Sequence, residues 1–149
     1  MTITTTFANV NKQLKDLLES LVDKDDNPYF ESVLLGIPNS NFRGFRFPIA
    51  IVRTVRGDYK TETFNKKNTP EWIHSTIGIL VTGDVQESYE FLIDLIDVIQ
   101  DKWEHDDTWI KLNDTVRLTE IESTEILDVP SDETIIRMAV FSLRHHIYK

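Results

Sequence analysis

Histidines are the first candidates for chemistry in this sequence, and their spacing argues against a shared metal site. His145 and His146 are neighbours in a segment that alternates like a strand. Their rings therefore point to opposite faces and cannot bind one metal ion. His74 stands alone in another strand-like segment, and His105 lies in a polar link. We interpret each as a hydrogen-bonded surface or edge residue, and we expect no metal site.

Two short motifs resemble known sites without meeting their requirements. Residues 23–28 read DKDDNP, an acidic run like the start of a calcium loop. Pro28 stands where such a loop needs glycine, and Leu34 stands where it needs a bidentate glutamate, which indicates a solvated connector instead. Residues 56–58 match the cell-adhesion tripeptide RGD. We expect no secretion signal in a start that reads MTITTT, so Gly57-Asp58 is better interpreted as a tight turn.

The usual sequence motifs of enzymes are missing. The sequence contains no G-x-S-x-G elbow, no Walker loop and no G-x-G-x-x-G fingerprint. It also contains no cysteine, which excludes disulfides, thiol nucleophiles and thiolate metal ligands. We therefore expect that the protein is not an enzyme and that it uses no cofactor.

The elements that would position these residues are organised around residues 85–103, VQESYEFLIDLIDVIQDKW. Their spacing predicts a helix with one apolar line, formed by Val85, Tyr89, Leu92, Ile96, Ile99 and Trp103. The acids on its outer side are solvated and poorly suited to acid–base catalysis; they are Glu87, Glu90, Asp94, Asp97, Asp101 and Glu104. Phe91, Leu95 and Val98 widen the apolar arc, either as a lip of the same core or as a subunit contact.

The remaining elements predict one α+β domain over residues 1–149. We expect a first helix at residues 7–22 and strands at residues 29–35, 47–53, 71–82, 116–127 and 134–148. In residues 71–82, Ile73, Ser75, Ile77, Ile79 and Val81 should face the central helix. The polar residues 54–69 suggest a flexible arm that orders on assembly. This order predicts a mainly antiparallel sheet of about five strands with two helices packed on one face.

Charge is divided unevenly along the chain. The net charge is −9, but residues 1–75 carry ten basic and nine acidic residues, whereas residues 76–149 carry six and sixteen. Within the first half, residues 42–67 hold seven basic residues against two acidic ones. Net acidity argues against DNA or anionic lipid as the main ligand. No apolar run is long enough to span a membrane, so we expect no membrane partner. The asymmetry would suit head-to-tail self-association, and an ordinary mixed surface remains the alternative.

Several loose motifs occur together in this chain. A leading helix at residues 7–22 precedes a strand that starts FPIAIV at residues 47–52. A long strand then enters a helix through IGILVTGD at residues 77–84, and the helix contains LIDLID at residues 92–97. A hairpin closes the chain. Over almost its full length, the sequence resembles the tail terminator (tail completion) proteins of long-tailed bacteriophages, and related head–tail joining proteins share parts of this plan.

The resemblance implies a structural role in the virion tail, after synthesis and assembly in the host cytoplasm. It implies a homo-hexameric ring that caps the tail tube, ends polymerisation of the tube protein and offers a surface to the head connector. DNA would pass through the lumen without specific binding, because acidic residues there would repel it. The candidate subunit or partner contacts are Phe42, Arg43, Phe45, Arg46, Arg56, Phe91, Leu95 and Val98. The alternatives are a small ligand-binding or regulatory module and an enzyme of unfamiliar type.

Overall fold

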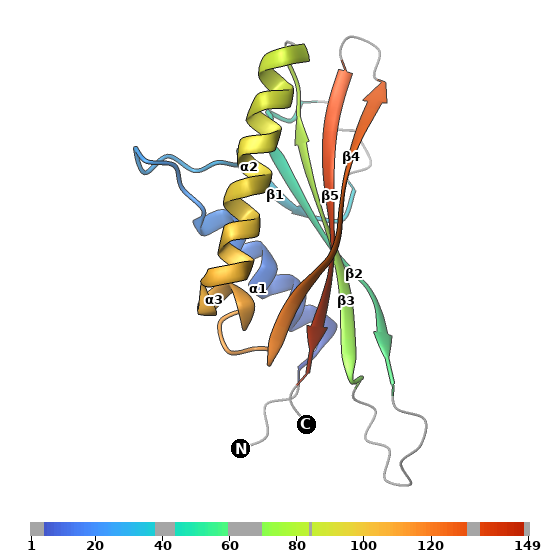
Figure 1. Ribbon diagram of the computed structural model, residues 1–149. Helices are drawn as coiled ribbons and strands as arrows, with labels where there is room; N and C mark the ends of the chain where they lie inside the picture. Colours follow the sequence, from blue (N-terminus) through green and yellow to red (C-terminus); the bar gives the residue numbers. More distant parts are fainter. Residues whose placement is uncertain (1–4, 38–43, 60–69, 84, 131–134, 148–149) are drawn as a thin grey trace, which may run out of the picture.

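A five-stranded sheet forms the framework of the protein in the computed structural model, which describes residues 5–37, 44–59, 70–83, 85–130 and 135–147 (Figure 1). The strand order is β1-β2-β3-β5-β4; β1 is parallel to β2, and the other neighbours are antiparallel. The elements are α1 (Phe7–Ser20), β1 (Ser32–Leu35), β2 (Ile49–Asp58), β3 (Trp72–Val81), α2 (Val85–His105), α3 (Asp107–Ile110), β4 (Leu118–Pro130) and β5 (Ile135–His146). The prediction of an α+β fold with a mainly antiparallel sheet is confirmed.

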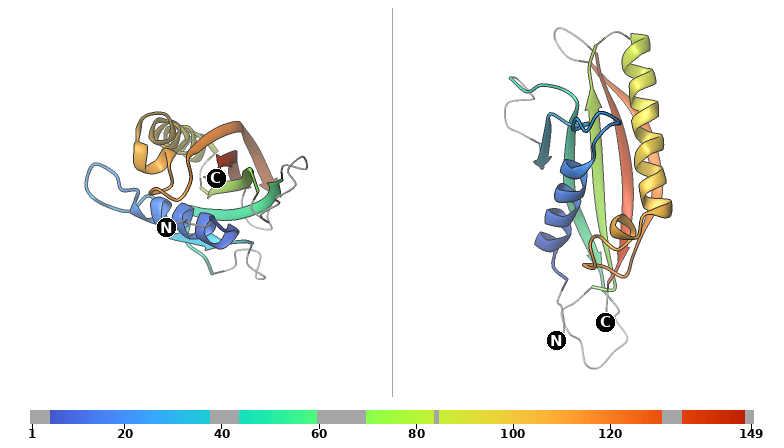
Figure 2. Two further views of the ribbon diagram at one scale, coloured as in Figure 1. Left: turned by 90° about the horizontal axis from the view of Figure 1, so that it is seen from below. Right: turned by 90° about the vertical axis from the view of Figure 1, so that its left-hand side faces the viewer.

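Both long helices cover the same face of the sheet. In Figure 1 they lie on one side of it, and Figure 2 shows them next to each other across that face. α1 packs against β1 and β2, and α2 packs mainly against β5, with further contacts to β3 and β4. Hereafter the face that carries the helices is the inner face, and the opposite face is the open face.

Alternation in β3 and β5 builds the core under the helices. On β3 the inner side chains are buried, as predicted: Ile73, Ser75, Ile77, Ile79 and Val81. On the inner face of β5 the buried residues are Ala139, Phe141, Leu143 and His145, followed by Ile147 just past the end of the strand. Because side chains alternate between faces along a strand, the other half of each strand lies on the open face.

The α2 helix buries a stripe that differs in part from the predicted one. Its buried apolar side chains are Leu92, Leu95, Ile96, Ile99 and Trp103. Tyr89 was predicted to belong to this stripe, but 45% of it is exposed. Leu95 was placed on a flank, but it belongs to the same core cluster as the apolar residues of α1. The buried stripe is therefore rotated toward Leu95, which joins the core shared by the sheet and both long helices.

β2 is longer than its sequence indicates. It continues to Asp58, so Thr54–Asp58 is strand and not the start of a flexible arm. The predicted turn at Gly57-Asp58 is also wrong, because Gly57 pairs with Ile73 of β3. A side chain at Gly57 would meet Pro70 at 3.0 Å and the Phe7 ring at 3.2 Å, which explains the glycine. Residues 60–69, the rest of the predicted arm, lie outside the described residues.

The link after α2 contains a short helix that the sequence analysis did not predict. Asp106 caps α3 by accepting a hydrogen bond from the backbone N–H of Thr108. Trp109 is buried, and the Trp103 indole N–H donates to its carbonyl oxygen at 3.2 Å. The two rings meet edge to face at 5.0 Å. The link therefore packs on the core at the C-terminal end of α2 and is not an exposed loop. None of the described helices combines the length and the apolar character needed to cross a membrane.

Candidate functional site

The most concentrated polar cluster on the open face surrounds His74. Its Nε2 lies 2.7 Å from Asp58 Oδ2, and its Nδ1 lies 2.9 Å from Glu122 Oε1. Asp58 ends β2, and Glu122 lies at a bulge in β4, where the pairing with β5 shifts register. An imidazole protonated on both nitrogens donates to both carboxylates, whereas the neutral ring donates to only one. The contact therefore ties β2, β3 and β4 together across the open face.

The residues next to this cluster also pair among themselves. The guanidinium of Arg144 lies 4.8 Å from the Trp72 ring centre, and the His146 ring stacks on Trp72 at 4.5 Å. Arg144 Nε donates to Glu120 Oε2 at 2.7 Å. Cationic and acidic groups are thus matched across neighbouring strands, which favours a role in holding the sheet.

A second polar chain lies on the inner face, inside the core. His145 is fully buried, with Nδ1 at 2.8 Å from Thr119 Oγ1 and Nε2 at 2.9 Å from Ser75 Oγ. The Ser75 hydroxyl lies 3.4 Å from that of Thr54, which donates to the side-chain oxygen of Asn11 on α1. The chain of contacts joins four strands to the first helix.

Burial controls the charge of His145. Removal from water lowers the pKa of His145 from 6.5 to about 3, and the nearby His74 adds to this effect. A neutral imidazole donates through one nitrogen and accepts through the other, and the two hydroxyls complement either arrangement. Ser75 is 1% exposed and His145 is 0% exposed, so this hydroxyl–imidazole pair is closed to a substrate. Its geometry supports a structural role.

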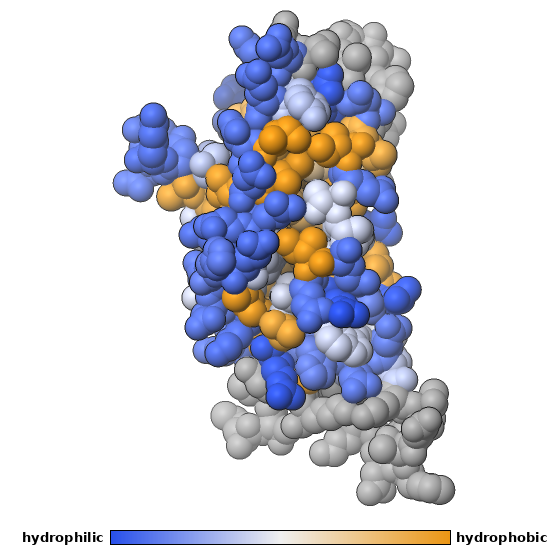
Figure 3. Space-filling model, in the orientation of Figure 1, coloured by the Kyte–Doolittle hydropathy of each residue, from blue (hydrophilic) through white to orange (hydrophobic). Residues whose placement is uncertain are grey.

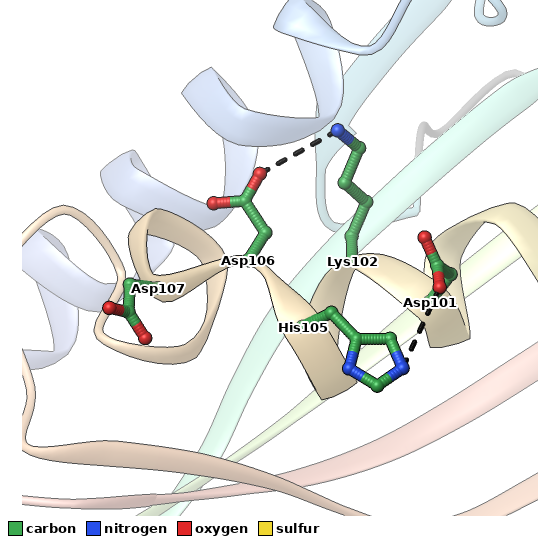
Figure 4. Close-up of a pocket in the computed structure, with 5 residues that line it drawn as sticks. All are labelled: Asp101, Lys102, His105, Asp106 and Asp107. Carbon is green, nitrogen blue, oxygen red and sulfur yellow. Dashed lines mark ion pairs between the residues drawn. The ribbon is translucent and has the colours of Figure 1, made fainter.

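The junction of α2 and α3 forms an open polar depression of about 410 Å³ (Figure 4). It is lined by Asp101, Lys102, His105, Asp106 and Asp107. Lys102 pairs with Asp106 at 3.6 Å, and His105 pairs with Asp101 at 3.9 Å. Figure 4 shows the two pairs on different sides of the helix junction, with Asp107 pointing away from both. Among the residues that the structure describes, no group of three or more histidines and acids is placed to hold a metal ion.

A second pocket, of about 450 Å³, lies where β3 passes into α2. Its lining residues come from the start of β2, the end of β3 and the first turns of α2: Phe47, Pro48, Val81, Thr82, Gly83, Glu87, Ser88 and Phe91. The ring of Phe91 is 39% exposed at this pocket. This position separates Phe91 from the buried stripe of its own helix.

The contact residues predicted before and within β2 have different surroundings. Phe42 and Arg43 lie outside the described residues. Phe45 is half-buried and packs on the open face against a small apolar cluster of Ile49, Ile51, Leu80 and Ile136. Arg46 is exposed, and Arg56 is exposed with its Nε 3.4 Å from Asp58 Oδ1. Both described arginines are therefore accessible to a partner.

The three candidate contact residues on α2 also differ in how much they are exposed. Leu95 is 1% exposed, so it stabilises the core, and its prediction as a subunit contact is corrected. Val98 is half-buried and packs against that core. Phe91 alone keeps substantial exposure. The wide apolar arc is therefore largely a lip of the core.

Exposed acids follow one side of α2. All six acids on the outer side of α2 are exposed: Glu87, Glu90, Asp94, Asp97, Asp101 and Glu104. In Figure 3, hydrophilic side chains follow this helix, and apolar side chains form a band beside it that extends toward β4. β4 contributes the exposed Ile126 and Leu127. Arg53 and Arg56 are exposed on β2, where they pair with open-face positions of β3, and Arg46 before β2 is also exposed.

No protein-family model matches this chain, and no curated protein is detectably similar to it in sequence.

The chain of contacts around His145 was missed in the sequence. The alternation had placed Ser75 on the core face of its strand, and it had separated His145 from His146. Ser75 and His145 each lie on the core face of a strand, and buried hydroxyl and imidazole groups need hydrogen-bond partners. This pattern could have indicated a hydrogen bond between the two strands. Thr119 and Asn11 carried no comparable signal, since only the strand pairing and the helix position bring them to this chain.

Proposed function

We propose that this protein is a structural subunit of a bacteriophage tail. Copies of the chain assemble into a ring that caps the tail tube, ends its polymerisation and offers a surface for head attachment. The sequence resemblance supports this proposal, and the arrangement of two helices on one face of a mainly antiparallel sheet is compatible with it. The subunit acts by binding other proteins and carries out no catalysis.

The observation that carries the proposal is the separation of opposite charges on the exposed surface. Arg53 and Arg56 are exposed on β2, and four acids lie along β4 on the other side of the sheet. A closed ring uses two different patches on each subunit, one of which meets the other patch on the next copy. Complementary patches also steer subunits toward the correct encounter and disfavour the reverse one.

The acidic face of α2 has a separate role in this proposal, at the lumen of the ring. Six exposed carboxylates on one helix create a negative surface, which would repel the phosphates of DNA passing through the ring. Changing Glu90, Asp94 and Asp97 to lysine should therefore create DNA retention in assembled particles. Unchanged DNA passage and no DNA binding by this variant would contradict a position at the lumen.

The test of the proposal combines light scattering with negative-stain imaging of the purified protein, alone and with tail tubes. We expect six-membered rings, either in solution or at tube ends, and tubes that stop growing where a ring is bound. Tube-protein polymerisation with and without the chain gives a direct measure of termination. A protein that stays monomeric, leaves tube length unchanged and binds a small molecule in the pocket beside Phe91 would instead support a ligand-binding module.

A further inference from the structure

The sheet has two edges with different chemistry. β4 forms one edge over Leu118–Pro130. At the other side, β1 pairs only with Ile49–Val52, so Arg53–Asp58 of β2 extends beyond it. Within the described residues, this second half of β2 has a strand partner on one side only. Edge strands expose backbone groups that another strand can bind.

The β4 edge is acidic and partly apolar. Its four charged residues are all acids: Glu120, Glu122, Glu125 and Asp128. Ile126 is 40% exposed on the inner face, and Leu127 is 44% exposed on the open face. A strand of 13 residues with exposed apolar side chains is a site for strand pairing unless something covers it.

The β2 edge is basic and also partly apolar. Arg53 and Arg56 are exposed, and Val55 between them is 48% exposed at the bulge in the pairing with β3. Asp58 is the acid of this edge, and it is already held by His74 and Arg56. The edge therefore presents positive charge around an apolar centre.

In the part of the chain that the structure describes, each of the two edges has one charged side chain that no contact within the subunit matches. Glu120 pairs with Arg144, and Asp128 pairs with Arg137 at 3.3 Å. Among the described residues, neither Arg53 nor Glu125 has an ion-pair partner. Both lie on the open face, because Arg53 pairs with Thr76 of β3 and Glu125 pairs with Val140 of β5.

We propose that β4 of one copy lies along Arg53–Asp58 of the next copy, with Glu125 meeting Arg53 and Leu127 next to Val55. The occupant of each edge is thus a second copy of this chain. The inference deepens the proposed ring, because it names the two surfaces that meet. Contact between unlike edges repeats around a closed ring, and pairing there covers β4 and the second half of β2 in every subunit.

Cross-linking tests this contact cleanly, because the chain has no cysteine of its own. Val55→Cys and Leu127→Cys replace exposed side chains, so neither change should disturb the core. Mixing the two single variants under oxidising conditions should give a mixed disulfide dimer, and the double variant should give a ladder of oligomers. Glu104→Cys on the exposed side of α2 is the control, and it should not cross-link to Val55→Cys.

The outcomes of the cross-linking separate the possible arrangements. Absence of mixed dimers across the concentration range in which light scattering detects association overturns the proposal, as does absence of association up to millimolar protein. A strong homodimer of Leu127→Cys alone also overturns it, because that result would mean that two β4 edges meet symmetrically. Equal cross-linking with Glu104→Cys would indicate random collision and would have the same consequence.

Charge reversal provides the second, independent measurement. Glu125→Arg and Arg53→Glu should each weaken association by about tenfold, because each places like charges together at the contact. The double variant restores opposite charges and should recover most of the lost affinity. Two single effects that simply add in the double variant would overturn the pairing of these residues. Sedimentation measures the affinity, and circular dichroism verifies that all three variants are folded.

The failure of this inference can be distinguished from the failure of the proposed function. If the mixed disulfide forms but tube length is unaffected, the contact stands and the tail role fails. If the charge-reversed variants still cap tubes and form rings of normal affinity, the tail role stands and this contact fails.

Discussion

Replacement of His145 tests whether a buried neutral histidine makes the fold sensitive to acid. His145 donates and accepts hydrogen bonds inside the core, and burial lowers its pKa from 6.5 to about 3. Between these two values, the unfolded chain takes up a proton that the folded protein refuses. The free energy of unfolding therefore has its full value above pH 6.5 and falls as the pH drops toward 3.

The size of the effect follows from the two pKa values. Each unit of difference corresponds to about 1.4 kcal/mol, so the loss from His145 reaches about 2 kcal/mol between pH 8 and pH 5. A domain of this size is usually stable by about 5–15 kcal/mol, which makes such a loss easy to measure. Urea denaturation followed by tryptophan fluorescence at half-unit pH steps gives the required curve.

The comparison with His145→Gln isolates this contribution. Glutamine retains a donor and an acceptor but does not titrate, so the variant should lose about 2 kcal/mol less between pH 8 and pH 5. A constant offset between the two curves reflects altered packing and does not affect the comparison. His105→Gln, at a histidine with a 70% exposed side chain, is the control and should follow the wild-type curve. Parallel curves for wild type and His145→Gln would refute the reasoning.

Three further substitutions test the packing of the helices and the long strand, all by urea denaturation. Leu95→Ala should cost about 2–5 kcal/mol because it empties a core position, whereas Phe91→Ala at the exposed pocket should cost clearly less; equal costs would contradict the burial of Leu95. Thr6→Ala should cost about 1 kcal/mol because the Thr6 hydroxyl accepts from the N–H of Asn9, and Thr6→Ser should retain the stability. Gly57→Ala should cost about 1–3 kcal/mol, since a new methyl group would lie 3.0 Å from Pro70; a neutral result would mean that the hairpin adjusts freely.

Local patterns in the sequence predict the elements that bury one face. The alternation in β3 identifies its core side, including Ser75, because alternation is a property of the extended backbone itself. The same kind of pattern predicts α2 to within two residues of its observed end. It does not decide between Tyr89 and Leu95 as core residues, because that choice depends on which elements pack against α2. Packing between elements is a tertiary contact that helical periodicity does not contain.

The second half of β2 and the chain around His145 were not predictable for different reasons. Residues Arg53–Asp58 are exposed or half-exposed on both sides, so no apolar alternation marks them as a strand. α3 has only four residues, fewer than a helical pattern needs, although Asp106 before it is a typical cap. The contact of His145 with Thr119 depends on the register between β4 and β5. Neither strand specifies that register by itself.

Polar contacts on the two faces of the sheet converge on β4, the edge strand that we propose for the ring contact. Thr119 binds His145 from the inner face, while Glu122 binds His74 and Glu120 binds Arg144 from the open face. These contacts join the first half of β4 to β5 and β3, on both faces of the sheet. A strand that is already ordered loses less conformational entropy when another chain pairs with it. A smaller entropy cost then offsets the free energy of binding. If β4 forms the proposed contact, Glu122→Gln should weaken subunit association, although Glu122 itself points across the open face toward His74.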